Sequence, residues 1–420
     1  QNCECIEIIE FKNGSPSLTS ISKYAFAGCK SLKEVNLPGT ITAVSDYAFD
    51  DCVSLANLSM PGVVKIGIYS FRNTAIENLV MGSNVTTIEK NAFENSKIKS
   101  VSFNAKLKTI GNYAFQNTLL TAVNITAGIT SIGSYAFCNN YNLASVTFAD
   151  NGSLTSIGSS AFKATAISGV EIPATVTTLG SSVFENCSNL TNVVFKGNAI
   201  STIDTAAFAN TAIQSIVIPN SVTTIKSGAF QDCTALTEVK LSSNLKTLAT
   251  ISTGKTTANK GSVFEGCTSL EYIDLPESLT YMGTFTFRNS GLKKITIPAN
   301  VKFLTVKEAL PSAMSGSTGT YFQDGSKDLP AMSENYFAGQ FANCLELEEV
   351  ILPTNLQAIG AGVFYNTPKL KTLKYTGYTG EENILPATVT ELGGYAFLNC
   401  GLESLTAGGL KSIYKNAFSE

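Results

Sequence analysis

The sequence contains neither histidine nor tryptophan among its 420 residues. Without histidine there are no Ser-His-Asp or Cys-His nucleophile systems, no imidazole general bases and no imidazole metal ligands. Charged residues are also scarce, at 15% against about 25% in an average soluble protein. The net charge of −3 comes from 29 basic and 32 acidic residues, with no long run of either sign. Nucleic acids and anionic membranes both require a basic face, so neither is expected as a partner.

The chain also lacks a stretch that resembles a membrane anchor or a signal peptide. No apolar run approaches the roughly 18 residues that a transmembrane helix needs. The first residues, Gln1 to Cys5, do not form a charged region followed by an apolar one. We interpret this as an amino terminus that has been processed or trimmed. With 44% hydrophobic residues, the chain can build a core.

A phenylalanine, usually preceded by alanine, recurs along the whole chain and marks an internal repeat. We call it the landmark phenylalanine. Most intervals are 22 to 25 residues, as in AFAGCKSLKEVNLPGTITAVSDYAF (25 to 49) and AFANTAIQSIVIPNSVTTIKSGAF (207 to 230). The landmark stands at positions 26, 49, 71, 93, 115, 137, 162, 184, 208, 230, 264, 287, 341, 364, 397 and 418.

This period matches a leucine-rich repeat, whose unit has roughly 20 to 29 residues. The segment L-x-x-V-x-L (32 to 37) predicts a short strand, and V-T-x-I (222 to 225) predicts a second. Because one unit cannot bury its apolar face alone, neighbouring units must stack. We therefore predict one domain over residues 1–420, a right-handed parallel β-solenoid of about 15 repeats. Single helical turns are expected around Ala-Phe, with the landmark phenylalanines stacked inside.

The unit AF…C..L..V.LP..VT.IG..AF resembles the BspA-like class of leucine-rich repeats over essentially the whole chain. The resemblance implies a secreted or surface-attached bacterial protein that adheres to host matrix proteins, to cells or to glycans. It implies no cofactor and marks no binding residue. The chain begins and ends within a repeat without an obvious polar cap, so we expect most of an ectodomain. We expect a monomer.

Cysteine recurs three residues after the landmark phenylalanine, in a column where other units have threonine or serine. Such a position favours a small side chain with a weak donor, bonded to a loop carbonyl of its own or a neighbouring unit. A disulfide ladder or a metal site is the alternative, although neighbouring columns would point side by side and zinc needs convergent ligands. Cys5 and Cys138 stand outside the column as possible surface thiols. The column contains Cys3, Cys29, Cys52, Cys187, Cys233, Cys267, Cys344 and Cys400.

Two arrangements could carry chemistry. Gly254 to Thr257 resembles the end of a phosphate-binding loop, but Ala249 replaces the first glycine and no strand-to-helix unit surrounds it. A flexible insertion is the better interpretation. Paired carboxylates, as in glycoside hydrolysis, are the remaining catalytic option, since they need no histidine.

The expected strand face differs along the chain. Up to about residue 215 it is mostly asparagine, serine, threonine and small residues, whereas charges and a tyrosine appear later. Lys240 shares a column with Asp274, which favours an ordinary cross-strand ion pair over a ligand contact or catalysis. The candidate binding residues on this face are Glu238, Lys240, Tyr272, Asp274, Lys294, Glu349 and Lys374.

Three insertions interrupt the repeat, at about 249–260, 305–338 and 376–385. The first two enter at the same point of the unit, one repeat apart. Loops longer than about 12–15 residues are usually functional or disordered, while neutral drift is the alternative. The second insertion adds the candidate binding residues Tyr321, Phe322, Tyr336 and Phe337.

The leading hypothesis is a non-enzymatic adhesion module, with its specific surface on repeats ten to fourteen. A structural spacer that holds another domain away from the cell surface is the alternative, and a carboxylate-based glycosidase ranks below both.

Overall fold

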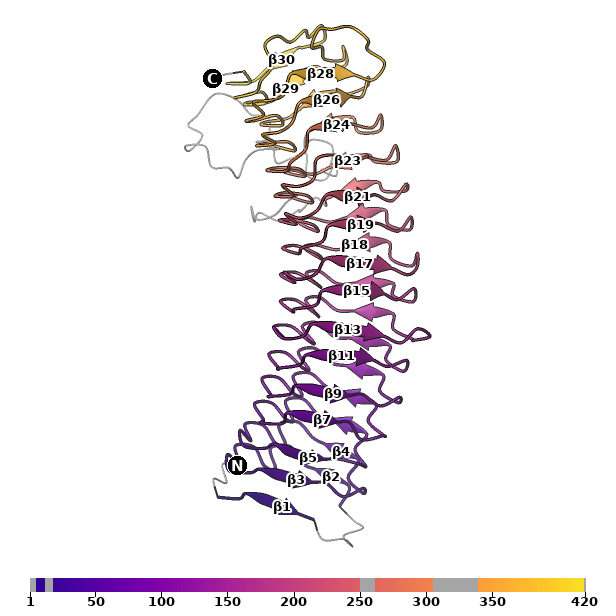
Figure 1. Ribbon diagram of the computed structural model, residues 1–420, viewed down its shortest axis with the longest axis vertical. Coiled ribbons are helices and arrows are strands. Elements are labelled where there is room, and N and C mark those ends of the chain that lie inside the picture. The colour runs from indigo at the N-terminus through magenta and orange to yellow at the C-terminus, as the bar shows by residue number, and fades with distance from the viewer. Residues whose placement is uncertain (1–4, 12–17, 250–260, 305–338, 419–420) are drawn as a thin grey trace, which may run out of the picture. The chain divides into compact units, whose positions relative to one another are not determined.

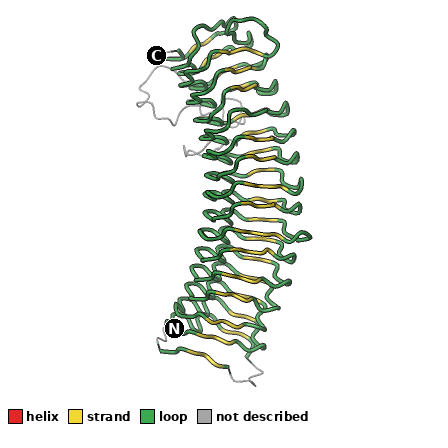
Figure 2. The backbone as a smooth tube through the Cα atoms, in the orientation of Figure 1, coloured by secondary structure: helices red, strands yellow, loops and turns green. Residues whose placement is uncertain are grey.

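The computed structural model describes residues 5–11, 18–249, 261–304 and 339–418. The chain forms two compact units, Gln1–Ile200 and Ser201–Glu420. Within each unit the repeats stack as short parallel strands joined by turns (Figure 1). The described residues contain no helix, as Figure 2 shows by its yellow strands and green loops. None of them provides a helix that could cross a membrane.

In the first unit, each repeat contributes a strand of three or four residues and then one of two residues. The longer strands are β1 (Ile8–Glu10), β3 (Glu34–Asn36), β5 (Asn57–Ser59), β7 (Asn78–Val80), β9 (Ser100–Ser102), β11 (Ala122–Ile125), β13 (Ser145–Phe148), β15 (Gly169–Ile172) and β17 (Asn192–Phe195). The shorter strands form one eight-stranded sheet, made of β2 (Ser20–Ile21), β4 (Ala43–Val44), β6 (Lys65–Ile66), β8 (Thr87–Ile88), β10 (Thr109–Ile110), β12 (Ser131–Ile132), β14 (Ser156–Ile157) and β16 (Thr178–Leu179).

The second unit repeats this plan. Its longer strands are β19 (Ser215–Val217), β21 (Glu238–Lys240), β24 (Lys294–Thr296), β26 (Glu349–Leu352) and β28 (Thr372–Tyr375). Its shorter strands form two four-stranded sheets, made of β18 (Thr202–Ile203), β20 (Thr224–Ile225), β22 (Thr247–Leu248), β23 (Tyr281–Met282), β25 (Phe303–Leu304), β27 (Ala358–Ile359), β29 (Glu391–Leu392) and β30 (Ser412–Ile413).

The core of each unit lies between its two strand series and its turns. Leu, Val and Ile of both strands point inward because successive strand residues alternate between faces, as the exposed–buried–exposed pattern of β21 illustrates. The landmark phenylalanines stack in line, with ring centroids 5.1–5.6 Å apart in residues 1–200. The spacing is 5.3–5.7 Å in residues 201–420. The predicted internal stack is confirmed.

The segment around each landmark phenylalanine forms tight turns and not the expected helical turn. In one repeat Tyr47 (φ 58°) and Asp51 (φ 57°), two residues before and after Phe49, have left-handed backbone conformations. An α-helix requires negative φ at every residue, so this alternation excludes it. The residues that follow the phenylalanine by two are mainly Asn, Asp and Gly, which tolerate this conformation best.

These turns also join neighbouring repeats. The N–H of Phe49 donates to the carbonyl of Ser70 in the next repeat at 2.9 Å, and the N–H of Ala48 donates within its own turn to Ser45 at 3.3 Å. Donors therefore alternate between the next repeat and the same turn. The turn side becomes a third hydrogen-bonded ladder beside the two strand series, which makes the stack rigid without a helix.

The third insertion, at about 376–385, returns to the edge of β28. The N–H of Ile384 donates to the carbonyl of Leu373 at 2.9 Å, and the N–H of Leu373 donates to Oδ1 of Asn383 at 2.8 Å. Ile384 in turn bridges in parallel to Thr406 of the following repeat. This insertion therefore takes the place of a strand between two repeats.

Candidate functional site

The strand face of the second unit carries the sequence-predicted candidates in a regular order. Glu238 and Lys240 are exposed at the two ends of β21, while Val239 between them is buried. Residues 271–276 form no strand, so Tyr272 and Asp274 lie in a gap of the ladder between β21 and β24. Tyr272 is 59% exposed, the largest aromatic surface on this face among the described residues.

The charges of this face pair only in part. Lys294 of β24 lies directly opposite Glu349 of β26, and their side chains form an ion pair of 2.9 Å. Across the part of the chain that the structure describes, Lys240 and Asp274 form no ion pair. The expected pairing of these two is therefore wrong, because residues 271–276 do not join the strand ladder beside β21.

The same holds for Glu238 and Lys374, which form no ion pair with any described residue. Lys374 lies opposite Ile351 in the β26–β28 register, so the ladder offers it no acid. The surface of Glu238, Lys240, Tyr272, Asp274 and Lys374, which we call the open charged face, thus presents both signs of charge to solvent.

In the first unit, several charges beside the longer strands are paired across repeats, as Lys293 and Glu271 are in the second unit (2.8 Å). The exposed pairs are Lys33–Glu7 (2.9 Å), Lys99–Glu77 (2.9 Å) and Lys196–Glu171 (3.0 Å). Between them the face is neutral and hydrogen-bonded along the stack: Ser100 Oγ donates to Asn78 Oδ1 at 2.7 Å, and Thr147 Oγ1 to Asn124 Oδ1 at 3.2 Å. The polar groups of this face therefore bond largely to one another.

The described cysteines of the column are buried except Cys400, which is partly exposed, and their thiols are free. Cys233 Sγ donates to the carbonyl of Phe208 in the preceding repeat at 3.1 Å, whereas Thr211 Oγ1 donates to the same carbonyl from its own repeat at 2.9 Å. Cys187 and Cys344 repeat this bond, to Phe162 and Phe287, at 3.1 and 3.0 Å. Several short donors of the column thus bond to a landmark carbonyl, whereas Thr118 donates to Asn140.

Burial keeps these thiols neutral. It raises the pKa of the thiols of Cys233 and Cys344 to about 11. Reactive and metal-binding cysteines need a thiolate and a lowered pKa, so the geometry suits packing. Among the described residues no group of His, Cys, Asp and Glu could hold a metal ion.

Cys138 and Cys5 differ from each other. Cys5 is exposed, whereas Cys138 is only 3% exposed, so the suggestion of a surface thiol is wrong for Cys138. Its neighbour Asn140 occupies the cysteine column and is fully buried. The Asn140 amide donates to the carbonyls of Phe115 and Phe137, both at 2.8 Å. It therefore makes both the bond to the preceding repeat that a cysteine makes in this column and the bond within its own repeat that a threonine makes.

Sequence reasoning missed a charged feature on the turn side. Both arginines of the chain directly follow a landmark phenylalanine and bind an acid at the equivalent position of the preceding repeat. Arg72 binds Asp50 through two hydrogen bonds of 2.8 Å, and Arg288 binds Glu265, which is 5% exposed. The shared motif F-R-N-[ST] was the available signal. These pairs are structural, since each acid is buried beneath its partner.

An asparagine ladder runs beside this turn column in the first unit. Asn95 donates to Asn73 at 3.0 Å, Asn117 to Asn95 at 2.8 Å, and Asn139 to Asn117 at 3.0 Å. These residues have left-handed backbones. Their side chains are occupied with each other, so the ladder stabilises the turns and offers few groups to a ligand.

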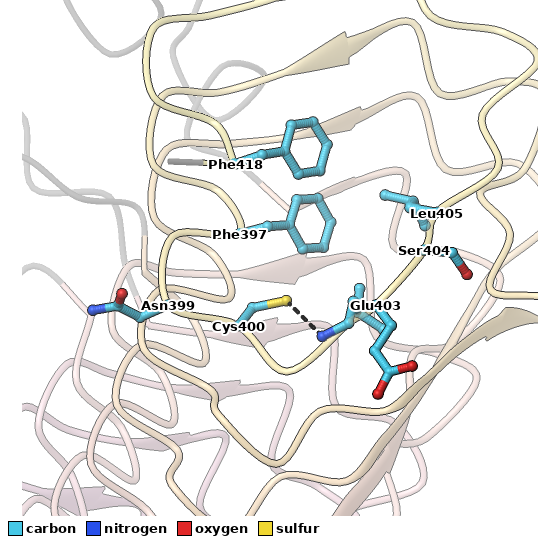
Figure 3. A pocket seen from close by; sticks show the side chains of 8 residues that line it. Phe397, Asn399, Cys400, Glu403, Ser404, Leu405 and Phe418 are labelled. Atoms are coloured by element: carbon cyan, nitrogen blue, oxygen red, sulfur yellow. Dashed lines mark hydrogen bonds between the residues drawn. The ribbon is translucent and has the colours of Figure 1, made fainter. Parts of the chain in front are cut away.

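A cavity of about 390 Å³ opens beside Phe397 and Phe418 in the last described repeat (Figure 3). Phe397 of the landmark stack and Cys400 of the cysteine column form part of its wall, whereas Phe418 (49% exposed), Glu403 and Ser404 in the lining face solvent. Figure 3 shows Asn399 and Glu403 directed away from the rings. Without convergent polar groups, this cavity lacks the features of a specific ligand site.

Several sequence-predicted residues lie outside the described residues. They are Cys3, the phosphate-loop remnant at 254–257, and the insertion residues Tyr321, Phe322, Tyr336 and Phe337.

Parallel stacking of short strands around repeated Leu, Val, Ile and Phe defines the leucine-rich-repeat class. Models of the BspA type leucine-rich repeat region match six times, at residues 1–119, 64–191, 108–237, 201–308, 326–380 and 377–420. The chain belongs to the BspA type leucine-rich repeat family. Membership points to a protein-interaction or surface module.

Solved structures of bacterial repeat proteins are similar to the chain. A leucine-rich repeat protein from Bacteroides ovatus is 20% identical, with 96% of this chain and 79% of that chain covered and a TM-score of 0.49. A leucine-rich cell surface protein from Faecalibacterium prausnitzii is 23% identical, with 86% and 84% covered and a TM-score of 0.41. The pneumococcal vaccine antigen PcpA is 17% identical, with 85% and 87% covered and a TM-score of 0.48. No curated protein matches the sequence.

Proposed function

We propose that the chain is a non-enzymatic recognition module that binds a protein partner through the open charged face of residues 201–420. The observation that carries this proposal is the exposure of Tyr272 (59%) on a face where Glu238, Lys240, Asp274 and Lys374 form no ion pair with described residues, while the adjacent Glu271 pairs with Lys293 at 2.8 Å. An exposed tyrosine supplies a large contact area at low entropic cost, and tyrosines are enriched at binding hot spots. Unpaired charges of both signs remain available to a partner's complementary charges.

The backbone supports this use of the face. The two strand series and the turn ladder hold the face without a helix or a long described loop, so little ordering accompanies association. A specific interface buries on the order of 1,600 Å² in total, which a face of several stacked strands can supply. We extend the proposal to an extracellular or cell-surface location and to a contribution from residues 305–338, as the family resemblance and the insertion length suggest.

A binding screen against immobilised extracellular matrix proteins tests the proposal. The variant combines Tyr272→Ser, Lys240→Ala and Lys374→Ala. Its matched control is Tyr141→Ser, because Tyr141 of the first unit is 70% exposed and lies off the open charged face. The triple variant is expected to weaken binding by about a hundredfold, since a hot-spot truncation alone costs about 2 kcal/mol or more.

Two further outcomes are informative. Replacement of residues 305–337 by a short linker should weaken binding in addition, if the insertion contributes to the interface. Equal binding by the triple variant and the wild type, with both folded, would contradict the proposal for this face.

A structural spacer is the second candidate function. The neutral face of the first unit favours it, because Asn78, Ser100, Asn124 and Thr147 bond to one another and leave few groups for a partner. A spacer predicts no binding to any protein of the screen by a folded chain. A carboxylate glycosidase is the weakest candidate and predicts hydrolysis that is lost in Glu238→Gln.

A further inference from the structure

A second cavity, of about 670 Å³, opens on the longer-strand face of the first unit. It lies over β13, β15 and β17 and the loops that follow them, entirely within residues 145–196. Specific ligand pockets have volumes of about 300–1,000 Å³, so the size suits a small molecule. This cavity belongs to neither the open charged face nor the core.

One position of the strand face beside the cavity lacks a side chain. In the column that begins the longer strands, Gly169 stands opposite Asn192 of the next repeat, where other repeats have Asn57, Asn78, Ser100 or Ser145. A Cβ added at Gly169 would meet no heavy atom closer than 3.7 Å, and its φ is not left-handed. Neither backbone nor packing requires glycine here, and its consequence is open space on the face.

The strand ladder is also interrupted at this place. β11 pairs with β13 and β15 pairs with β17, but no pairing joins β13 to β15 within the described residues. Val146 and Val170 of these two strands adjoin the cavity but are buried, because their side chains point into the core. The outward strand positions that line the cavity are Ser145, Thr147, Gly169, Glu171 and Asn192.

The rim of the cavity is polar, and it includes the exposed acid Asp150, which forms no ion pair with a described residue. Glu171 and Lys196 both line it and form an ion pair of 3.0 Å, with side chains 64% and 51% exposed. An anionic ligand would meet the carboxylates of Asp150 and Glu171, whereas a neutral hydroxyl can accept from the Lys196 ammonium and donate to either carboxylate while the ion pair remains. Asn192 adds one further donor and acceptor.

The apolar part of the lining complements this rim. The half-buried Phe148 and Pro173 also line the cavity. A sugar ring has the matching chemistry, with an apolar C–H face and several neutral hydroxyls. We propose that the cavity around Gly169, Glu171 and Lys196 binds a neutral saccharide residue. This site does not depend on the protein partner proposed for residues 201–420.

Saturation-transfer NMR of the full chain with free glucose, galactose, mannose and N-acetylglucosamine tests the proposal, with zwitterionic triglycine as the charged comparison. At least one of the four sugars is expected to bind, and triglycine is not expected to displace it. Gly169→Asn fills the cavity with the residue found at Asn57 and Asn78 of the same column, and should weaken binding at least tenfold. Ser215→Asn makes the same kind of change in this column outside the cavity and should leave binding unchanged.

Glu171→Gln provides a second arm that keeps the shape of the rim. It should weaken sugar binding about tenfold, because a hydrogen bond to a charged group is lost. If Gly169→Asn does not fold, this arm decides the outcome. Failure of all four sugars to bind, stronger binding of triglycine, or sugar binding unchanged in both folded variants overturns the proposal. None of these results bears on the matrix-protein screen, which uses variants of the other unit.

Discussion

The landmark phenylalanine stack permits a sharp prediction of stability. Phe115 is fully buried, with ring centroids 5.3 Å from Phe93 and 5.5 Å from Phe137 and an edge contact to Phe103 at 5.7 Å. Phe115→Ala removes the ring from between two others. The ladder of backbone hydrogen bonds, such as Phe115 N–H to the carbonyl of Ala136 at 2.8 Å, keeps the neighbouring repeats apart.

The cavity left by Phe115→Ala therefore cannot collapse. Core Phe→Ala changes cost about 3–5 kcal/mol, and the cost rises with the residual cavity, while each aromatic pair adds about 0.5–1.5 kcal/mol beyond its buried area. We expect a loss near the upper limit, about 5 kcal/mol in the free energy of unfolding.

Phe418→Ala is the matched control. Its ring is 49% exposed and contacts one stacked neighbour, Phe397, at 5.4 Å. Half the burial and one neighbour reduce the expected loss to about 1–2 kcal/mol. Urea unfolding followed by far-ultraviolet circular dichroism measures both. A loss below about 2 kcal/mol for Phe115→Ala, or equal losses for the two variants, would refute the reasoning.

Two further predictions concern charge. Burial raises the pKa of the thiols of Cys233 and Cys344 to about 11. Because a thiol in the unfolded chain titrates near 9, the stabilisation of the folded state by each neutral thiol is complete below pH 9 and is lost between pH 9 and 11. From pH 8 to 10 each thiol should therefore lower the free energy of unfolding by about 1–2 kcal/mol. Over the same range the double variant with Thr at both positions should lose about 3 kcal/mol less than the wild type in urea unfolding. An equal pH dependence of the two proteins would contradict this. Arg288→Met leaves the buried carboxylate of Glu265 without its partner and should cost about 3–5 kcal/mol in the same assay. Lys369→Met breaks the exposed ion pair of Lys369 with Glu346 and should cost less than about 1 kcal/mol. Equal costs would mean that the burial of Glu265 does not control the effect.

The periodic part of the fold could be predicted from the sequence because the repeat reports the same packing many times. Leu236 and Val239 alternate with exposed residues in one repeat, and equivalent residues do so in its neighbours. The turn segment was mispredicted, since Ala-Phe flanked by polar residues also fits one helical turn. Asp51, Asn73 and Asn95, two residues after each phenylalanine, were the overlooked signal of left-handed conformations.

The candidate surfaces followed the sequence less closely. Column counting placed Lys240 beside Asp274, but residues 271–276 leave the strand ladder, and this departure has no sequence signature. Likewise, the sequence does not distinguish Gly169 from the other small residues of the strand face. Only its position opposite Asn192 and beside the Glu171–Lys196 pair shows that it lies beside a cavity.

The sequence by itself determined the repeat, the strands, the buried phenylalanine stack and the membership of the BspA type family, because each depends on local periodicity that every unit restates. The tertiary structure decided which polar groups remain available for binding. Asn95 and Asn117 are of a residue type that also occurs on recognition surfaces, yet their side chains bond to one another across repeats. The charges of Glu238 and Lys374 stay open because no neighbouring strand provides a partner. Availability depends on contacts between residues about 22 positions or more apart, which a local pattern does not encode.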